Sequence, residues 1–355
     1  MEYLRLKDVC DINMGQSPAS DSYNDAGDGV PFFQGNADFG DRYPITRKWC
    51  NAPTKMAQPG DILVSVRAPI GAINYAKEEC CIGRGLAAVT PDRDKVSPDF
   101  VFWFLKGKKE ELNSKGTGST FKAISRKVLE EILVPNVDLK EQSKYAEILE
   151  KIYFVQKSQK QELKYLDDLI KARFVEMFGS IHESTKYPYI AVKDLTDVIS
   201  GGTPSRDRSE YWYNGTIPWV KTTELQNNVI KNVDEYITES GLADSSAKMV
   251  PIGTVLVAMY GQGKTRGMTA YLGIEASTNQ ACACILPSEK IDSMYMWKYF
   301  ELSYDKLRSL AQGAGQPNLN GNMIKNFQVL VPPIELQNEY VSFVNQIDKS
   351  KFSFP

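Results

Sequence analysis

A glycine-rich loop with basic residues, Tyr260-Gly-Gln-Gly-Lys-Thr-Arg266, has some of the residue types of a phosphate-binding motif. The complete motif of nucleoside triphosphatases needs a glycine five residues before Gly263, and Ala258 occupies that position. We therefore do not expect an ATPase loop. The loop could instead contact a nucleic-acid backbone, because glycine amides and the side chains of Lys264 and Arg266 can bind phosphate oxygens. The alternative is an ordinary turn with solvated charges.

Residue types for catalysis are scarce in this chain. Among 355 residues only His182 is a histidine, so Ser-His chemistry, Cys-His chemistry and a histidine-rich metal site would all need this one residue. It follows the expected central helix in the polar string His-Glu-Ser-Thr-Lys, where we expect a solvated loop. No two of the six cysteines have CxxC spacing. We expect Cys282 and Cys284, two apart in an apolar run, to be small core residues, and we expect no metal site.

Two strings that resemble enzyme motifs are incomplete. Val331-Pro-Pro-Ile334 lacks the acidic or amide residue and the aromatic residue of a DNA methyltransferase tetrapeptide, and no glycine-rich cofactor loop opens a doubly wound sheet. Pro91-Asp-Arg-Asp-Lys95 is better explained as a turn than as a nuclease carboxylate cluster. We therefore expect no catalysis by this chain itself.

Small polar side chains recur at matching places in the two halves of the chain. The loops Gly116–Lys122 and Gly313–Leu319 each follow an expected helix, and Asn279-Gln280 opens an expected strand. Amide and hydroxyl side chains are types that read base edges. The candidate DNA contacts are Arg67, Arg84, Lys115, Ser119, Thr120, Lys122, Lys221, Tyr260, Lys264, Thr265, Arg266, Gln280, Gln316 and Asn318.

An internal repeat organises these features. The string LKDVCDINMGQSP from Leu6 recurs as VKDLTDVISGGTP from Val192, and later strings recur in the same order, ending with EILVPNVDL and FQVLVPPIEL. The offset grows from 186 residues, between Leu6 and Val192, to 197 residues, between Leu139 and Leu336. This growth indicates one duplicated domain whose loops lengthened.

Each half is predicted to be α+β, with its strands first. Short β-branched runs between glycine, proline and asparagine predict strands at 61–66, 86–89, 254–259 and 281–286. Apolar residues at helical spacing predict one helix at 100–112 and one at 294–310. We therefore expect two domains of one fold.

A long helix is expected between the halves. Residues 139–178 contain no glycine or proline, and about 60 Å of helix should end at Gly179. Steps of three and four select a coiled-coil seam that includes Leu149, Ile152, Leu163, Leu166, Ile170 and Met177. The alternative is an amphipathic helix on a single domain. The expected segments are a first domain at 1–138, the helix at 139–180, a second domain at 181–331 and the start of a further helix at 332–355.

The ordered set of these motifs resembles the specificity subunit of type I restriction-modification systems. The resemblance rests on the twin starts, on AMYGQGKTRGMTAYLGIEASTNQACACILP, on the ends ILVPNVDLKEQ and VLVPPIELQNE, and on the central helix. It implies two target recognition domains joined by a coiled-coil spacer, each reading one half of a bipartite site in double-stranded DNA. It also implies methyltransferase and restriction subunits as partners. S-adenosylmethionine, ATP and Mg²⁺ would be used by those partners, with no cofactor in this chain.

One departure from the family concerns the last helix. After Leu336 it runs as QNEYVSFVNQIDKSKF and stops at Pro355, where the family normally continues for several turns. The seam from Ile152 to Met177 would then be partly uncovered. Three hypotheses follow: a homodimer through the seam, a helix borrowed from a methyltransferase subunit, or a truncated product of a variable locus.

Two other interpretations remain open, namely a specificity subunit of a restriction enzyme that cleaves and methylates with one partner polypeptide, and a scaffold protein that binds no DNA. The net charge of -2 argues against a uniformly basic DNA binder, but it averages over the whole chain. No apolar run is long enough for a membrane span and the start is no signal peptide, so a cytoplasmic location is expected. If the helix acts as a ruler, four residues inserted within Gln156–Gln159 should change the unread gap by about one or two base pairs.

Overall fold

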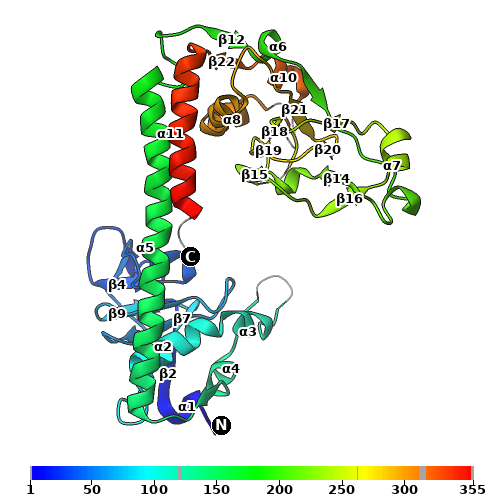
Figure 1. The fold of residues 1–355 in the computed structure, drawn as a ribbon. Helices are drawn as coiled ribbons and strands as arrows, with labels where there is room; N and C mark the ends of the chain where they lie inside the picture. Colours follow the sequence, from blue (N-terminus) through cyan, green and yellow to red (C-terminus); the bar gives the residue numbers. More distant parts are fainter. Residues whose placement is uncertain (1, 119–121, 262, 312–316, 353–355) are drawn as a thin grey trace. The chain divides into compact units, whose positions relative to one another are not determined.

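The computed structural model describes residues 2–118, 122–261, 263–311 and 317–352. The chain divides into two compact units, Met1–Ser158 and Gln159–Pro355, called unit 1 and unit 2 below. In each unit the first strand is followed by a short helix and a second strand, and the last strand follows three short helices (Figure 1). The α+β organisation with two related halves is confirmed. The finer division into four segments stays a prediction.

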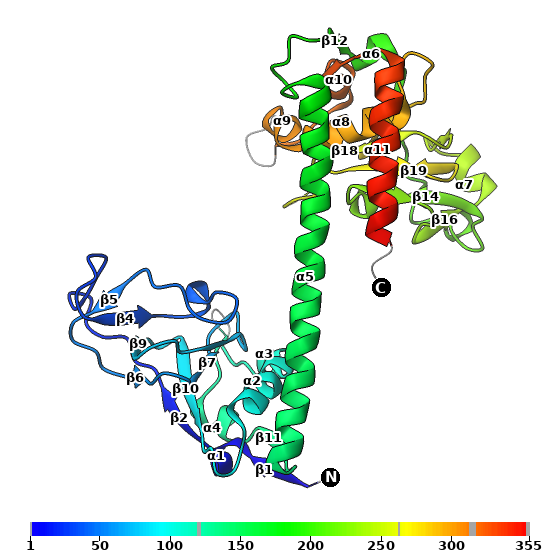
Figure 2. The same cartoon turned by 60° about the vertical axis from the view of Figure 1, so that its left-hand side comes forward.

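The first and last strands of unit 1 pair, so the two ends of the repeated segment meet. β1 (Tyr3–Arg5) is antiparallel to β11 (Leu133–Pro135). Two sheets lie between them in sequence, with the strand orders β2-β10-β7-β8 and β3-β5-β4-β9-β6 (Figure 2). The strands are β2 (Cys10–Met14), β3 (Tyr23–Asn24), β4 (Val30–Phe33), β5 (Trp49–Cys50), β6 (Met56–Ala57), β7 (Ile62–Ser65), β8 (Ile73–Tyr75), β9 (Cys80–Ile82) and β10 (Leu86–Pro91).

Short helices complete the core of unit 1. The helix predicted at 100–112 is interrupted at Lys108 and forms α2 (Pro98–Gly107) and α3 (Lys109–Ser114). Phe102 on α2 is buried in one cluster with Val64 and Val89 of the first sheet. The remaining helices are α1 (Leu6–Val9), α4 (Arg126–Glu130) and the 3₁₀ turn η1 (Asn36–Asp38).

Unit 2 repeats this plan. β12 (Tyr189–Ala191) pairs antiparallel with β22 (Gln328–Leu330), and the two sheets have the orders β13-β21-β18-β19-β15 and β16-β14-β20-β17. Cys282 and Cys284 are buried in β21, as expected. The strands are β13 (Val198–Ser200), β14 (Ile217–Val220), β15 (Asn228–Ile230), β16 (Glu235–Ile237), β17 (Met249–Val250), β18 (Val255–Ala258), β19 (Thr269–Leu272), β20 (Ala276–Thr278) and β21 (Cys282–Ile285).

The helix predicted at 294–310 in unit 2 is also interrupted. The break is at Ser303, whose hydroxyl donates to the carbonyl of Tyr299 at 2.7 Å. The helices are α6 (Val192–Leu195), η2 (Ser209–Tyr211), η3 (Thr222–Glu224), α7 (Glu239–Ala243), α8 (Ser293–Leu302), α9 (Tyr304–Ser309), α10 (Gly321–Lys325) and α11 (Ile334–Phe352).

The long helix α5 (Leu139–Phe178) has the predicted bounds. It ends where Gly179 adopts a left-handed φ of +86°, a conformation that glycine takes without a steric penalty. Its first half packs on unit 1, where Glu150 accepts hydrogen bonds from Arg42 Nη1 at 2.7 Å and Trp103 Nε1 at 3.1 Å. Its second half packs in unit 2.

The face that α5 buries in unit 2 differs from the predicted seam. Ile170, Phe174 and Phe178, which are four residues apart, are buried, whereas steps of three and four select Arg173 and Met177 after Ile170. α11 lies antiparallel against this part of α5, and Arg173 forms an ion pair with Glu339 at 2.7 Å. Among the predicted seam residues, Leu166 and Met177 are half-buried, while Leu149, Ile152 and Leu163 are exposed.

Candidate nucleic-acid interface

A turn before β10 in unit 1 is held by backbone hydrogen bonds to three separate segments. Gly83 N donates to Phe33 O at 2.8 Å, Val66 N donates to Gly85 O at 2.9 Å, and Gln16 N donates to the carbonyl of Ile82 at 3.0 Å. The ends of β4 and β7 and the loop after β2 therefore converge on this turn. Arg84 lies at its centre.

The turn before β21 in unit 2 has the same set of bonds. Asn279 N donates to Val220 O at 3.0 Å, Met259 N donates to Ala281 O at 2.8 Å, and Gly202 N donates to Thr278 O at 2.8 Å. Because each bond has a counterpart in unit 1, the positions of the two units can be matched one by one. Gln280 is the counterpart of Arg84.

The matched bonds align four positions whose side chains differ between the units. We call the set in unit 1 edge 1; it consists of Ser17, Gln34, Arg67 and Arg84. We call the set in unit 2 edge 2; it consists, in the same order, of Thr203, Lys221, Tyr260 and Gln280.

Edge 1 lines one open pocket of about 480 Å³, together with Asn36 and other residues. Ser17 Oγ accepts a hydrogen bond from the backbone N of Arg84 at 3.3 Å, which fixes the turn. Within the part of the chain that the structure describes, the side chains of Arg67 and Arg84 are exposed and make no hydrogen bond or ion pair. The pocket is therefore positively charged and rich in hydrogen-bond donors.

Edge 2 has a different electrostatic character. Thr203 Oγ1 donates to Gln280 Oε1. Lys221 Nζ lies 2.9 Å from Glu235 Oε1, and this hydrogen bond raises the pKa of Lys221. Arg206 also pairs with Glu235 at 2.6 Å, and its guanidinium lies 3.6 Å from the ring centroid of Trp212. Although burial opposes the change, the hydrogen bonds from Lys221 and Arg206 lower the pKa of Glu235. Asp234, whose Oδ2 lies 3.6 Å from Lys221 Nζ, supplies a second carboxylate, so both Lys221 of edge 2 and the neighbouring Arg206 are paired with acidic side chains.

Near the end of the first repeated motif, each unit has a glycine that lets the turn come close to the sheet. A Cβ on Gly15 would lie 2.2 Å from Gly83 O, and a Cβ on Gly201 would lie 2.2 Å from Thr278 O. Gly85, on the turn itself, would place a Cβ 2.3 Å from Gln34 O. These distances leave no room for a side chain. Steric crowding therefore explains why LKDVCDINMGQSP and VKDLTDVISGGTP have glycine at the same position.

The other sequence candidates lie outside the two edges. Lys115 pairs with Glu111 at 2.7 Å, and the guanidinium of Arg266 donates to Pro317 O. Lys122 and Lys264 are exposed. Thr265 and Asn318 are half-buried, and Asn318 Oδ1 has no hydrogen-bond partner in the described part. Ser119, Thr120 and Gln316 lie outside the described residues.

Sequence reasoning missed half of edge 1 and one residue of edge 2, namely Ser17, Gln34 and Thr203. A signal was present, because Ser17 and Thr203 are the matched Ser/Thr pair that precedes the last proline of the repeated motif. Gln34 and Lys221 likewise follow the matched strings VPFF and IPWV.

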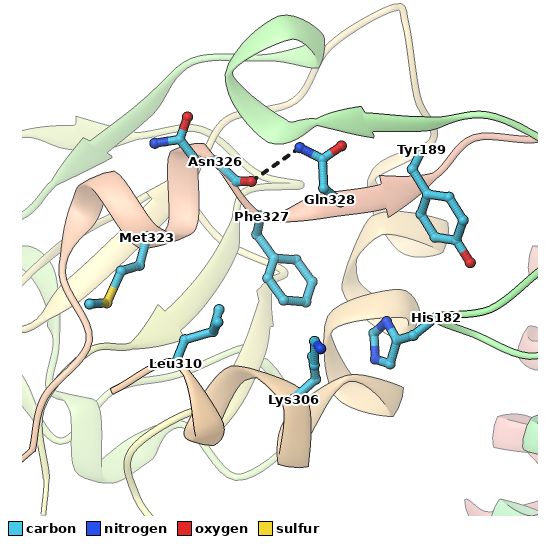
Figure 3. A pocket seen from close by; sticks show the side chains of 8 residues that line it. All are labelled: His182, Tyr189, Lys306, Leu310, Met323, Asn326, Phe327 and Gln328. Atoms are coloured by element: carbon cyan, nitrogen blue, oxygen red, sulfur yellow. Dashed lines mark hydrogen bonds between the residues drawn. The ribbon is translucent and has the colours of Figure 1, made fainter. Parts of the chain in front are cut away.

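Unit 2 also has an open, mostly apolar cavity of about 600 Å³ that shares no residue with edge 2. Figure 3 shows His182 and Tyr189 at the right of the cavity, Phe327 in the centre, and Lys306 and Leu310 below. His182 is half-buried there and not a solvated loop residue as predicted. Burial, and to a lesser extent Lys306, lower the pKa of His182. A neutral imidazole fits this position because two aromatic rings lie nearly perpendicular to it. Its ring centroid is 6.1 Å from that of Tyr299 and 6.3 Å from that of Phe327.

The family described as type I restriction modification DNA specificity domain matches residues 1–172 and 184–354 of the chain. The specificity subunit of the type I restriction enzyme MjaIX of Methanocaldococcus jannaschii is 21% identical over an alignment of 371 positions, which covers 97% of this chain and 85% of that protein. The MjaX specificity subunit of the same organism is 48% identical over 141 residues, or 40% of this chain and 33% of the relative.

The EcoR124I/EcoR124II specificity subunit of Escherichia coli is 26% identical over 151 residues, or 42% of this chain and 37% of the relative. The chain thus matches only about a third of the length of the MjaX and EcoR124I/EcoR124II subunits. The crystal structure of the type I restriction-modification S subunit from M. genitalium has a TM-score of 0.61 at 13% identity, and the match covers 99% of this chain and 90% of that one. This last likeness concerns the fold alone.

Proposed function

Because the chain belongs to the family of type I restriction modification DNA specificity domains, we propose that it is the sequence-specific DNA-recognition subunit of a type I restriction-modification complex. Unit 1 reads one half of a bipartite site in double-stranded DNA and unit 2 reads the other half. The observation that carries this proposal is the pair of matched edges, since three of their four equivalent backbone positions hold side chains of different hydrogen-bonding types. A duplicated reader with two different contact sets fits a target of two different half-sites.

The chain itself recognises DNA, and its partners perform the chemistry. Methyltransferase subunits would bring S-adenosylmethionine, and restriction subunits would bring ATP and Mg²⁺. Burial raises the pKa of the Cys10 thiol and of the Cys80 thiol to about 12, so neither thiol is a nucleophile at neutral pH. The described residues contain no group of three or more His, Cys, Asp or Glu placed to hold a metal ion. The absence of a cofactor and a cytoplasmic location stay predictions; none of the described helices could cross a membrane.

The function is tested with the full chain, purified together with any methyltransferase subunit that binds it. We expect DNA affinity to fall steeply between about 50 and 200 mM salt, because phosphate contacts release counterions. Mapping of methylated adenines should give a two-part site. Replacing residues 1–138 by the first domain of another family member should change one half of that site and leave the other half unchanged. No DNA binding at low salt, or a change in both halves, would contradict the proposal.

A second copy of the chain could cover an apolar stripe on the first half of α5. Tyr145, Ile148, Leu149, Ile152 and Val155 are 40–55% exposed and follow one helix face. An antiparallel pairing centred on position 150 would set Tyr145 against Val155 and Ile148 against Ile152 of the second copy, so apolar residues would meet apolar residues in both halves of the pair.

We therefore expect light scattering at micromolar concentration to give the mass of a dimer. Ile152→Glu should give a monomer, because a charge in the middle of the stripe would be desolvated by pairing. The matched control is Ser158→Glu, which adds the same charge at an exposed position of α5 outside the stripe and should leave the dimer intact. A monomeric wild-type chain at this concentration would rule the homodimer out.

A further inference from the structure

We propose that Arg84 and Gln280, which occupy the same position in the two units, select different bases: Arg84 reads guanine in one half-site and Gln280 reads adenine in the other. This inference rests on the proposed function. It adds the chemical class of base that each unit accepts and the residue that makes the choice.

The position is built to present one side chain. Its backbone is tied on both sides to neighbouring strands, through Gly83 and Gly85 in unit 1 and through Asn279 and Ala281 in unit 2. The central side chain is exposed in both units. A rigid turn with an exposed tip costs little conformational entropy on binding, since only the side chain must be ordered.

Edge 1 offers mainly donors. Arg67 and Arg84 bring two guanidinium groups without partners in the described part of the chain, and Gln34 and Asn36 line the same pocket. Guanine presents two acceptors, N7 and O6, in the major groove, whereas cytosine presents a donor and adenine presents one of each. The planar fork of arginine matches the two acceptors of guanine. A donor-rich pocket therefore favours guanine over the other bases.

Edge 2 offers both donors and acceptors. The amide of Gln280 can donate from Nε2 and accept at Oε1, and one of the two lone pairs of Oε1 is already used by Thr203. This combination matches adenine, which accepts at N7 and donates from N6. Lys221 adds no free charge because it is paired with Glu235 at 2.9 Å. Edge 2 therefore lacks the unpaired guanidinium groups that favour guanine at edge 1.

The competing explanation for exposed arginines is contact with phosphates. Such contacts strengthen binding to every sequence and carry no base preference. Base contacts instead change the preference at one position of the site. The two explanations therefore predict different results from the same substitution.

The test exchanges the two side chains, as Arg84→Gln in one variant and Gln280→Arg in another. Each full-length variant, with its co-purifying methyltransferase subunit, selects from a randomised duplex library that is then sequenced. Arg84→Gln should lower the preference for guanine at one position by roughly 5- to 150-fold and raise that for adenine. Gln280→Arg should do the reverse at one position of the other half-site. The remaining positions should be unchanged.

Arg93→Gln is the matched control, because Arg93 is an exposed arginine of unit 1 outside edge 1, and it should leave every preference unchanged. An equal loss of affinity for all sequences in Arg84→Gln would identify a phosphate contact and overturn the inference, while leaving DNA recognition intact. Unchanged preferences in both exchange variants would also overturn it. A wild-type complex without any sequence preference would instead refute the proposed function.

Discussion

Replacing Phe174 by alanine is expected to lower the free energy of unfolding of unit 2 by about 3–5 kcal/mol. Phe174 is fully buried where α5, α8 and α11 meet. Its ring centroid lies 5.0 Å from Phe178, 5.6 Å from Tyr340 and 6.1 Å from Tyr295. Removing the ring loses its burial and these aromatic contacts, and it leaves a cavity among side chains that are themselves fixed by packing.

Urea denaturation of the full chain, followed by tryptophan fluorescence, measures this effect. The matched control is Val175→Ala, because Val175 is the next residue of α5 and is 46% exposed. It should change the free energy of unfolding by less than about 0.5 kcal/mol. Equal shifts for the two variants would show that the aromatic cluster does not stabilise unit 2 as argued.

The features that depend on local residue types could be predicted from the sequence. α5 runs over the predicted 139–178 because that stretch has neither glycine nor proline, while Gly179 supplies the left-handed residue that ends it. The four strands predicted from runs of β-branched and apolar residues overlap β7, β10, β18 and β21. The duplication follows from an ordered set of matching strings, which is long enough to exclude chance.

Features that depend on tertiary packing could not be predicted in the same way. The spacing of three and four residues along α5 is that of a helix with a coiled-coil partner. The last turns of α5 instead pack on the core of unit 2, so the buried residue after Ile170 is Phe174 and not Arg173. The helices are interrupted at Lys108 and Ser303, although the apolar residues keep helical spacing across both positions. His182 lies in a polar string, and only the fold shows that Tyr299 and Phe327 surround it.

The candidate site was predictable in part for a related reason. Arg67, Arg84, Tyr260 and Gln280 were chosen by residue type, but their matching depends on hydrogen bonds between strands far apart in sequence. Ser17 was missed because a serine before a proline looks like any turn residue. The register that places it beside Arg84 is a property of the sheets.

Replacing Gly15 by alanine is the prediction that joins fold and recognition. A Cβ there would lie 2.2 Å from Gly83 O and 2.8 Å from the carbonyl oxygens of Ile82 and Leu86. All three are backbone atoms, so β2 and the turn that carries Arg84 must move apart. We expect unit 1 to lose about 1–3 kcal/mol of stability. Recognition of its half-site should weaken roughly tenfold or more, since the base contact of Arg84 is misplaced.

The matched control for this substitution is Gly107→Ala at the end of α2. Nothing lies within 4 Å of a Cβ on Gly107, so an added methyl group meets no atom and slightly favours the helix. Denaturation and selection from the randomised duplex library, applied to both variants, separate the two roles of the turn. Because the close approach at Gly201 is untouched, the half-site read by unit 2 should keep its base preferences in Gly15→Ala. Loss of preference in both half-sites would mean that the two edges do not act independently.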